Sequence, residues 1–145
     1  MFLGRYEHNI DDKGRLTIPA RYRELLANGA YVTLGFDHNL MVLPAASFEQ
    51  MYAHVNEMSM TDPTARQLKR LIFSSAERCE FDRAGRILLP QFLRESVGLD
   101  GSATLVGVGD YFEIWSPAYW AQQNELLQDT ETTTQRFAAL NLPIR

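Results

Sequence analysis

The sequence predicts an α+β fold that is mainly β: a closed β barrel made of two copies of one unit, with helices on the outside. The stretch 11–23 occurs a second time as 82–94, and short apolar runs separated by turn residues recur in both halves. A unit with a few short strands and one small helix buries too little surface to fold well alone. Two such units should therefore share one core or interlock, which removes their exposed strand edges.

The internal repeat aligns at fixed offsets. When Gly14 is placed on Gly85, the same shift superimposes further identical residues: Asp11 on Asp82, Arg15 on Arg86, Pro19 on Pro90 and Arg23 on Arg94. So many matches at fixed offsets are improbable by chance, and we interpret them as a duplication. A repeat of this kind has to be recognised before single elements are assigned, because it decides the fold.

Each copy predicts a turn, a strand and the start of a helix. Aspartate can bond its own downstream backbone and glycine accepts a positive φ, so Asp11 and Gly14 suit a tight turn. Pro19 and Pro90 fit the first turn of a helix, where no N–H is needed. The predicted segments are buried strands at 16–18 and 87–89 and helices at 20–27 and 91–97.

Outside the repeated stretch, apolar runs of good β character predict strands and capping residues predict helices. Strands are expected at 2–10, 30–35, 40–43, 103–107 and 112–115. Helices are expected after Pro44, after Asp62, after Ser116 and over 130–140. The predicted organisation is a first repeat over 1–57, a connecting helix within 58–73, a second repeat over 74–120 and a C-terminal helical tail over 121–145.

The charges of the chain are segregated. The 145 residues carry a formal net charge of −4, which by itself argues against generic nucleic-acid binding. However, cations gather in 1–23, whereas 95–135 contains acidic residues and no Lys or Arg. An acidic chain with such segregation can still present a basic face.

Composition also bears on localisation. No apolar run approaches the length of a membrane span, and the N-terminus lacks the pattern of a signal peptide. The single cysteine, Cys79, excludes an internal disulfide and fits a reducing compartment. We expect a soluble, cytoplasmic protein without a membrane partner.

The paired motifs resemble the MraZ family of bacterial transcriptional regulators. The likeness covers nearly the whole chain, up to about residue 120, and rests on two copies of Asp, Gly-Arg, apolar residues and Pro. The residues that carry it are Met1-Phe2 with Gly4, Lys13-Gly14-Arg15, Ile18-Pro19, Arg21-Tyr22-Arg23, Asp82, Gly85-Arg86-Ile87 and Phe112-Glu113-Ile114-Trp115.

This resemblance implies a fold and a function. The fold would be two AbrB-like (SpoVT-type) swapped-hairpin units in one pseudo-twofold, double-psi-like barrel. Members of the family assemble into homo-oligomeric rings and bind double-stranded promoter DNA at short, G-containing direct repeats. These repeats lie upstream of the cell-division and cell-wall gene cluster that includes their own gene, which implies a nucleoid-associated regulator. The family's D-x-x-x-R element falls here on 11–15 and 82–86, and the DNA role attaches chiefly to the first.

Arg15 is the first candidate for reading DNA. A guanidinium can donate two hydrogen bonds to guanine O6 and N7, a discrimination of about 1–3 kcal/mol. The alternative is an ion pair with Asp11 that only fixes the turn, a role that Arg86 and Asp82 could share. The residues alone leave both roles open.

The other candidate DNA-binding residues have supporting roles. Phosphate contacts position a protein without reading sequence, and the cations suited to them are Lys13, Arg5, Arg21 and Arg23. One of the last two is expected on a solvated helix face or in an ion pair with Glu24 or Glu7. Asp11 and Gly14 would shape the turn. Ala84 replaces Lys13 in the second copy, so a DNA contact by Arg86 stays open.

Other clusters are interpreted as structural. Arg66, Lys69 and Arg70 form a small basic group that is expected to be a solvated helix face, with contact to DNA or a neighbouring subunit as the alternative. The histidines have no ligand-like spacing to Cys79, which is expected to be a small core residue. No acid, base and nucleophile set is visible, so we expect no enzyme, no catalytic residue, no metal, no cofactor and no small-molecule substrate. The rival to a DNA-binding regulator is a structural or protein-interaction ring module without specific DNA binding.

Overall fold

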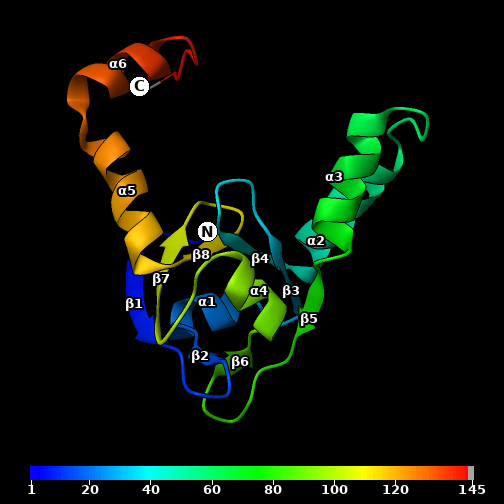
Figure 1. Cartoon of the computed structure of the whole chain (residues 1–145), viewed down its shortest axis with the longest axis vertical. Helices are drawn as coiled ribbons and strands as arrows, with labels where there is room; N and C mark the ends of the chain where they lie inside the picture. The colour runs from blue at the N-terminus through cyan, green and yellow to red at the C-terminus, as the bar shows by residue number, and fades with distance from the viewer. Residues whose placement is uncertain (144–145) are drawn as a thin grey trace.

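Eight strands and six helices span residues 1–143, the part of the chain that the computed structural model describes (Figure 1). The strands are β1 (Arg5–Asn9), β2 (Arg15–Thr17), β3 (Ala30–Leu34), β4 (Leu40–Pro44), β5 (Glu77–Cys79), β6 (Arg86–Leu88), β7 (Ser102–Gly107) and β8 (Phe112–Trp115). The helices are α1 (Ala20–Leu25), α2 (Ala45–Asn56), α3 (Pro63–Phe73), α4 (Gln91–Ser96), α5 (Pro117–Gln128) and α6 (Thr130–Ala138). The strand pairs are antiparallel. The predicted α+β class is confirmed.

The helix starts follow the predicted capping residues. The side chain of Asp62 accepts the N–H of Thr64 at 2.9 Å before α3, and Ser116 caps α5 in the same way. Pro19 and Pro90 stand one residue before α1 and α4, with ψ of 143° and 144°. They therefore direct the chain into each helix from the cap position instead of from the first helical turn.

The strands form two hydrogen-bonded sheets. The larger has the order β1-β7-β8-β4-β3-β5, and the smaller pairs β2 with β6. Isolated bridges join Ile10 to Leu16 and Phe81 to Ile87, so the chain next to β1 and β5 touches the small sheet. Within residues 1–143 no single continuous ladder closes on itself, and the closed barrel stays a prediction.

The two halves exchange strand partners. The strands β1, β2, β3 and β4 of the first half each pair with a strand of the second half, namely β7, β6, β5 and β8. Neither half therefore satisfies its backbone hydrogen bonds by itself. This interlocking is what the small size of each unit led us to expect.

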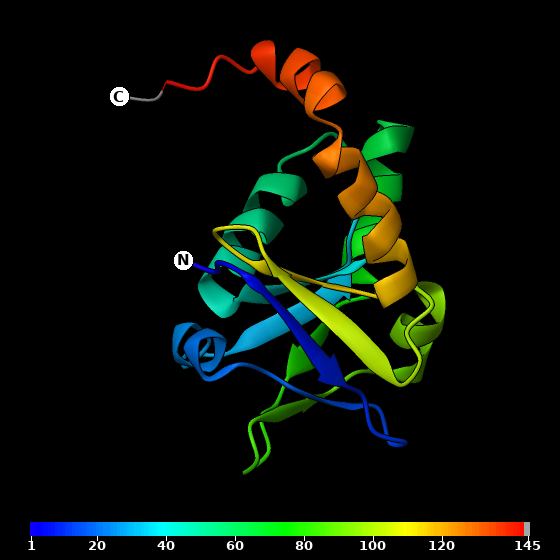
Figure 2. The ribbon, with the colours of Figure 1, turned by 90° about the vertical axis from the view of Figure 1, so that its left-hand side faces the viewer.

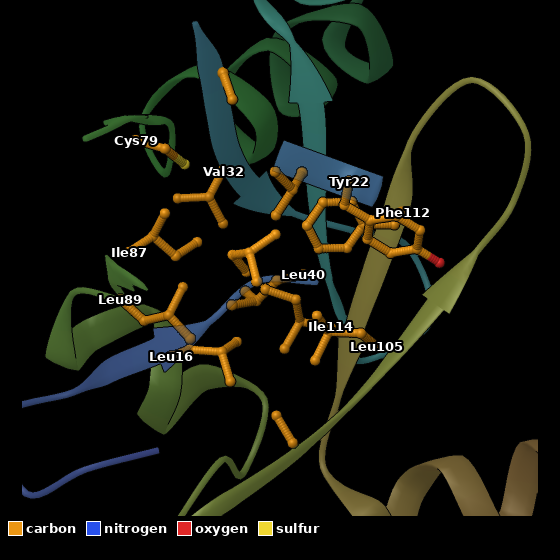
Figure 3. Close-up of a cluster of buried hydrophobic side chains, with 14 of the residues drawn as sticks. Leu16, Tyr22, Val32, Leu40, Cys79, Ile87, Leu89, Leu105, Phe112 and Ile114 are labelled. Atoms are coloured by element: carbon orange, nitrogen blue, oxygen red, sulfur yellow. The ribbon is translucent and has the colours of Figure 1, made fainter. Parts of the chain in front are cut away.

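Equivalent side chains of the two repeats meet in one apolar core (Figure 3). Leu16 of β2 and Ile87 of β6 lie opposite each other in the small sheet and are at most 1% exposed. Ile18 and Leu89, which follow these strands, are fully buried. Complete burial of such a side chain stabilises the fold by about 1.5–3 kcal/mol. The apolar positions of the repeat thus anchor the strands that follow both turns in one common core.

Tyr22 of α1 closes this core next to β8. Its ring centroid lies 5.1 Å from that of Phe2 and 4.7 Å from that of Phe112. Its hydroxyl donates a hydrogen bond of 2.8 Å to the carbonyl of Leu3. Burial, assisted by the neighbouring Tyr6, raises the pKa of Tyr22 to about 12.

The longer helices lie on two flanks of the sheets (Figures 1 and 2). α2 and α3 form a second, smaller apolar cluster with the large sheet, built on Met41, Leu43, Phe48 and Ile72. α5 and α6 extend away from the body and contain no buried residue. None of the described helices is long and apolar enough to cross a membrane.

Candidate functional site

The two copies of the repeated turn lie close together, at the lower end of the molecule in Figure 1. The pairing of β2 with β6 places Arg15 opposite Leu88 and Thr17 opposite Arg86. Each turn directly precedes its strand, so the turns flank a ladder that spans roughly 7 Å. The duplication therefore brings two turns with the same Asp-to-Arg spacing into one region of the surface.

The first turn is closed by Asp11. Its Oδ1 accepts the backbone N–H of Lys13 at 3.0 Å and of Arg15 at 2.8 Å, and its Oδ2 accepts the Nε–H of Arg15 at 2.6 Å. Gly14 has a φ of +86°, in the region where a side chain costs about 1–2 kcal/mol. The turn predicted from Asp11 and Gly14 is confirmed.

The second turn repeats this geometry. Oδ1 of Asp82 accepts the backbone N–H groups of Ala84 and Arg86, both at 2.9 Å, and its Oδ2 accepts Arg86 Nε–H at 2.8 Å. Gly85 has a φ of +76°. The repeated residues thus specify the same local structure in both halves.

The two arginines differ in how firmly they are held. Arg86 bonds to Asp82 and also lies 3.5 Å from Asp11 Oδ2 through its Nη1, so it ties the two turns together. Within residues 1–143, the side chain of Arg15 bonds only through Nε. Its terminal nitrogens remain for a ligand, and the side chain is 35% exposed.

The two carboxylates are held in their charged form. The backbone N–H of Arg15, and then its side chain, lower the pKa of Asp11 below its ordinary value. The backbone N–H and side chain of Arg86 lower the pKa of Asp82 in the same way. A charged Asp11 orients the Arg15 guanidinium through a charge-assisted hydrogen bond, which is shorter and stronger than a neutral one.

The geometry makes the two roles considered for Arg15 compatible. The ion pair with Asp11 exists, and it uses one edge of the guanidinium. A planar guanidinium has five N–H donors in a fixed fork, and four belong to the terminal nitrogens. The Asp11 contact therefore limits the motion of Arg15 and, within residues 1–143, leaves its outer donors without a hydrogen-bond partner. Lys13 is exposed on the same turn.

The other candidate cations do not gather at the first turn. Arg5 stands at the start of β1, separated from Asp11 by an extended segment of roughly 20 Å. Its guanidinium carbon lies 5.0 Å from the ring centroid of Trp120, a cation–π contact. Arg21 is exposed on α1, as expected for a solvated helix face. Arg23 is half-buried against the second turn.

Two further groups behave as structural elements. Arg66 and Arg70 are exposed on α3, and Arg66 donates a hydrogen bond of 2.8 Å to the carbonyl of Met60. Cys79 is buried in β5, and burial raises the pKa of its thiol to about 12. Because the thiolate is the nucleophilic form, this cysteine is a core residue, as predicted.

Two consecutive parts of the chain, residues 1–71 and 72–141, match the model of one protein family, described as "MraZ protein, putative antitoxin-like". The chain belongs to the MraZ family. Each of the two matches contains one of the Asp-to-Arg turns, so the family model recognises the same duplication that the strands display.

Individual relatives agree with this membership. The protein named "Transcriptional regulator MraZ" in Thermomicrobium roseum is 48% identical over 141 residues, which cover 97% of this chain and 99% of the relative. The protein of the same name in Roseiflexus castenholzii is 48% identical over 120 residues, covering 83% and 84% of the two chains. That of Desulfitobacterium hafniense is 46% identical over 129 residues, covering 89% and 90%.

Sequence reasoning missed the contacts that cross between the repeats. It paired Asp11 with Arg15 but not with Arg86, because strand pairing between halves is not visible in a linear pattern. It also gave no structural role to Arg94 of α4, whose guanidinium lies over Gly14. The available signal was that Arg23 and Arg94 stand at the same offset from the two turns.

Proposed function

We propose that this chain is a sequence-specific, DNA-binding transcriptional regulator that reads DNA through the first Asp-to-Arg turn. The observation that carries the proposal is the state of Arg15, which is oriented by Asp11 through Nε and keeps its terminal nitrogens for a ligand. Such a preorganised fork matches the O6 and N7 acceptors of guanine. The name of its relatives, transcriptional regulator MraZ, supports the same function.

The neighbouring residues have distinct roles in this proposal. Lys13, exposed at the tip of the turn, binds a phosphate, and Arg21 of α1 is a second candidate for such a contact. Asp11 and Gly14 shape the turn. Arg86 joins the second turn to Asp11 and thereby supports the first.

We also propose the finer structural class that the resemblance implies. The two sheets, with the bridges between them, would constitute a pseudo-twofold swapped-hairpin barrel of two AbrB-like units. We keep 1–57 and 74–120 as these units, 58–73 as the connecting helix and 121–145 as the tail.

The proposed working form is a homo-oligomeric ring. A single turn buries little surface, so one turn alone binds weakly. Several identical turns that meet repeated DNA boxes raise affinity through effective concentration. Neighbours related head-to-tail by rotation favour direct repeats. The proposed targets are short direct repeats upstream of the cell-division and cell-wall gene cluster, including its own gene, bound in the cytoplasm at the nucleoid.

The salt dependence of binding tests this function. We expect the protein to bind a duplex from upstream of its own gene more tightly than a duplex of shuffled sequence. The logarithm of the association constant should fall with the logarithm of salt concentration, with a slope of about 0.9 in magnitude for each neutralised phosphate. Fluorescence anisotropy at several salt concentrations measures both quantities.

Two lysine variants sharpen the test. Lys13→Gln should reduce the slope by about one phosphate contact for each bound turn, whereas the matched change Lys69→Gln on α3 should leave the slope unchanged. Equal binding of upstream and shuffled DNA at every salt concentration would contradict the proposal and favour a structural or protein-interaction ring module.

A further inference from the structure

Each turn glycine is covered by an arginine from the other half of the chain. A methyl group added to Gly14 would come within 2.8 Å of Nε and Cζ of Arg94, which belongs to α4 of the second half. A methyl group added to Gly85 would overlap the guanidinium of Arg23, which belongs to α1 of the first half. Both approaches are open only because glycine has no Cβ.

Backbone hydrogen bonds cross between the halves at the same two places. The carbonyl of Gly14 accepts the N–H of Leu89 at 2.9 Å, and the carbonyl of Gly85 accepts the N–H of Ile18 at 3.0 Å. Leu89 also accepts the Nε–H of Arg94 at 3.0 Å through its own carbonyl. The stem of Arg94 is therefore anchored in the second half, while its guanidinium lies on the turn of the first half.

We propose that Arg94 and Arg23 are reciprocal positioning residues, each holding the turn that belongs to the other repeat. Arg94 holds the Lys13-Gly14-Arg15 turn in place, and Arg23 holds the second turn. Both arginine side chains are half-buried, so each has given up part of its contact with solvent. Arg23 then serves the structure of the second turn and not a DNA phosphate.

The consequence for function rests on the proposed reading of DNA by Arg15. The second repeat contributes to that reading through Arg94, although its own turn, with Ala84 in place of Lys13, has one cation fewer at the matching position. The two repeats then have equivalent structures but different functions. Arg94 supports the turn that reads DNA, whereas Arg23 supports the second turn.

Amide hydrogen exchange in the free, full-length protein tests the positioning roles without DNA. We expect Arg94→Gln to accelerate exchange at Lys13, Gly14 and Arg15 by roughly three- to tenfold and to leave Ala84, Gly85 and Arg86 unchanged. Arg23→Gln, the matched change in the other repeat, should do the opposite. Core amides of β7 and β8 report global unfolding, and they should exchange at the parent rate in both variants.

Three outcomes would overturn the positioning roles. They are acceleration in both turns by either variant, acceleration that extends equally to the core amides, and no local acceleration at all. If Arg94→Gln does not fold, Arg94→Lys, which keeps the charge and loses the planar fork, is measured in its place with the same expected pattern.

DNA binding by the same variants separates this inference from the proposed function. Arg94→Gln should weaken binding of the upstream duplex more than Arg23→Gln does, with an unchanged salt slope, because Arg94 acts through Arg15 and not on a phosphate. A changed salt slope would make Arg94 a phosphate contact and contradict its positioning role. The expected exchange pattern together with unaltered DNA binding would contradict the reading role of the first turn and leave the reciprocal positioning intact.

Discussion

Asp11 is the residue on which both repeats converge. Its carboxylate accepts hydrogen bonds from the first turn and also lies within ion-pair distance of Arg86 from the second. An exposed ion pair of this kind contributes little to stability, because water screens the charges and the side chains lose entropy. We therefore attribute to Asp11 the orientation of Arg15 more than the stability of the fold.

The lowered pKa of Asp82 predicts a loss of stability in acid. A carboxyl group whose folded-state pKa is depressed contributes stability above its unfolded pKa, and that contribution is lost as the pH falls through the folded value. The ordinary value for Asp82 is 3.8, so the loss should begin near it and continue below. Urea unfolding of the parent and of Asp82→Asn measures this loss of stability. The pH is varied from about 3 to about 6, a range chosen around the usual aspartate pKa.

The difference in unfolding free energy between the parent and Asp82→Asn should depend on pH. Asn keeps an acceptor for the turn but has no charge, so the parent should be the more stable protein at pH 6 and the difference should shrink toward pH 3. A difference that stays constant over this range would show that the charge of Asp82 is not what stabilises the turn.

At the scale of the element, the turn is a unit that includes an arginine of the other repeat. Asp11, Gly14 and the backbone bonds of the turn are local, and the sequence predicts them. The covering side chain of Arg94 comes from α4, many residues away in the chain. A glycine in this setting is constrained both by its positive φ and by the close approach of another side chain.

The two constraints on a turn glycine can be separated by substitution. Gly85 and Gly101 have φ values of +76° and +74°, but only Gly85 is covered by a side chain, and the space beside Gly101 is open. Gly101→Ala should lower the free energy of unfolding by about 1–2 kcal/mol, the cost of the left-handed conformation alone. Gly85→Ala should lower it further, because Arg23 must also move.

Denaturant unfolding of the two glycine variants measures this difference. Equal losses of stability would mean that Arg23 moves aside without cost, and they would argue against a close packing role for that side chain at the second turn.

At the scale of the whole molecule, the duplication explains why the chain forms one interlocked body. The strands of each half pair with those of the other, and Leu16 and Ile87 meet in the common core. Because β2 of one half pairs with β6 of the other, the two turns that precede these strands lie in one region of the surface.

The sequence predicts much of this arrangement, for reasons that are local. Short apolar runs, turn residues and capping residues locate the elements, and β8 has the predicted bounds. The fixed offset between the repeats predicts that the two turns share one structure. The contacts that decide the site are different: the link from Arg86 to Asp11 and the packing of Arg94 on Gly14 depend on strand register between halves. The stacking of Arg5 on Trp120 likewise joins segments that are distant in sequence.

Binding of an upstream duplex by the Arg15→Ala variant shows whether Arg15 reads DNA. The variant should keep the circular dichroism spectrum and the oligomeric size of the parent, because Arg15 is not part of the core. We predict that its affinity for the upstream duplex falls to its affinity for a shuffled duplex, since the base-edge contact worth about 1–3 kcal/mol at each turn is gone. Equal affinity of variant and parent for the upstream duplex would contradict the reading role of Arg15.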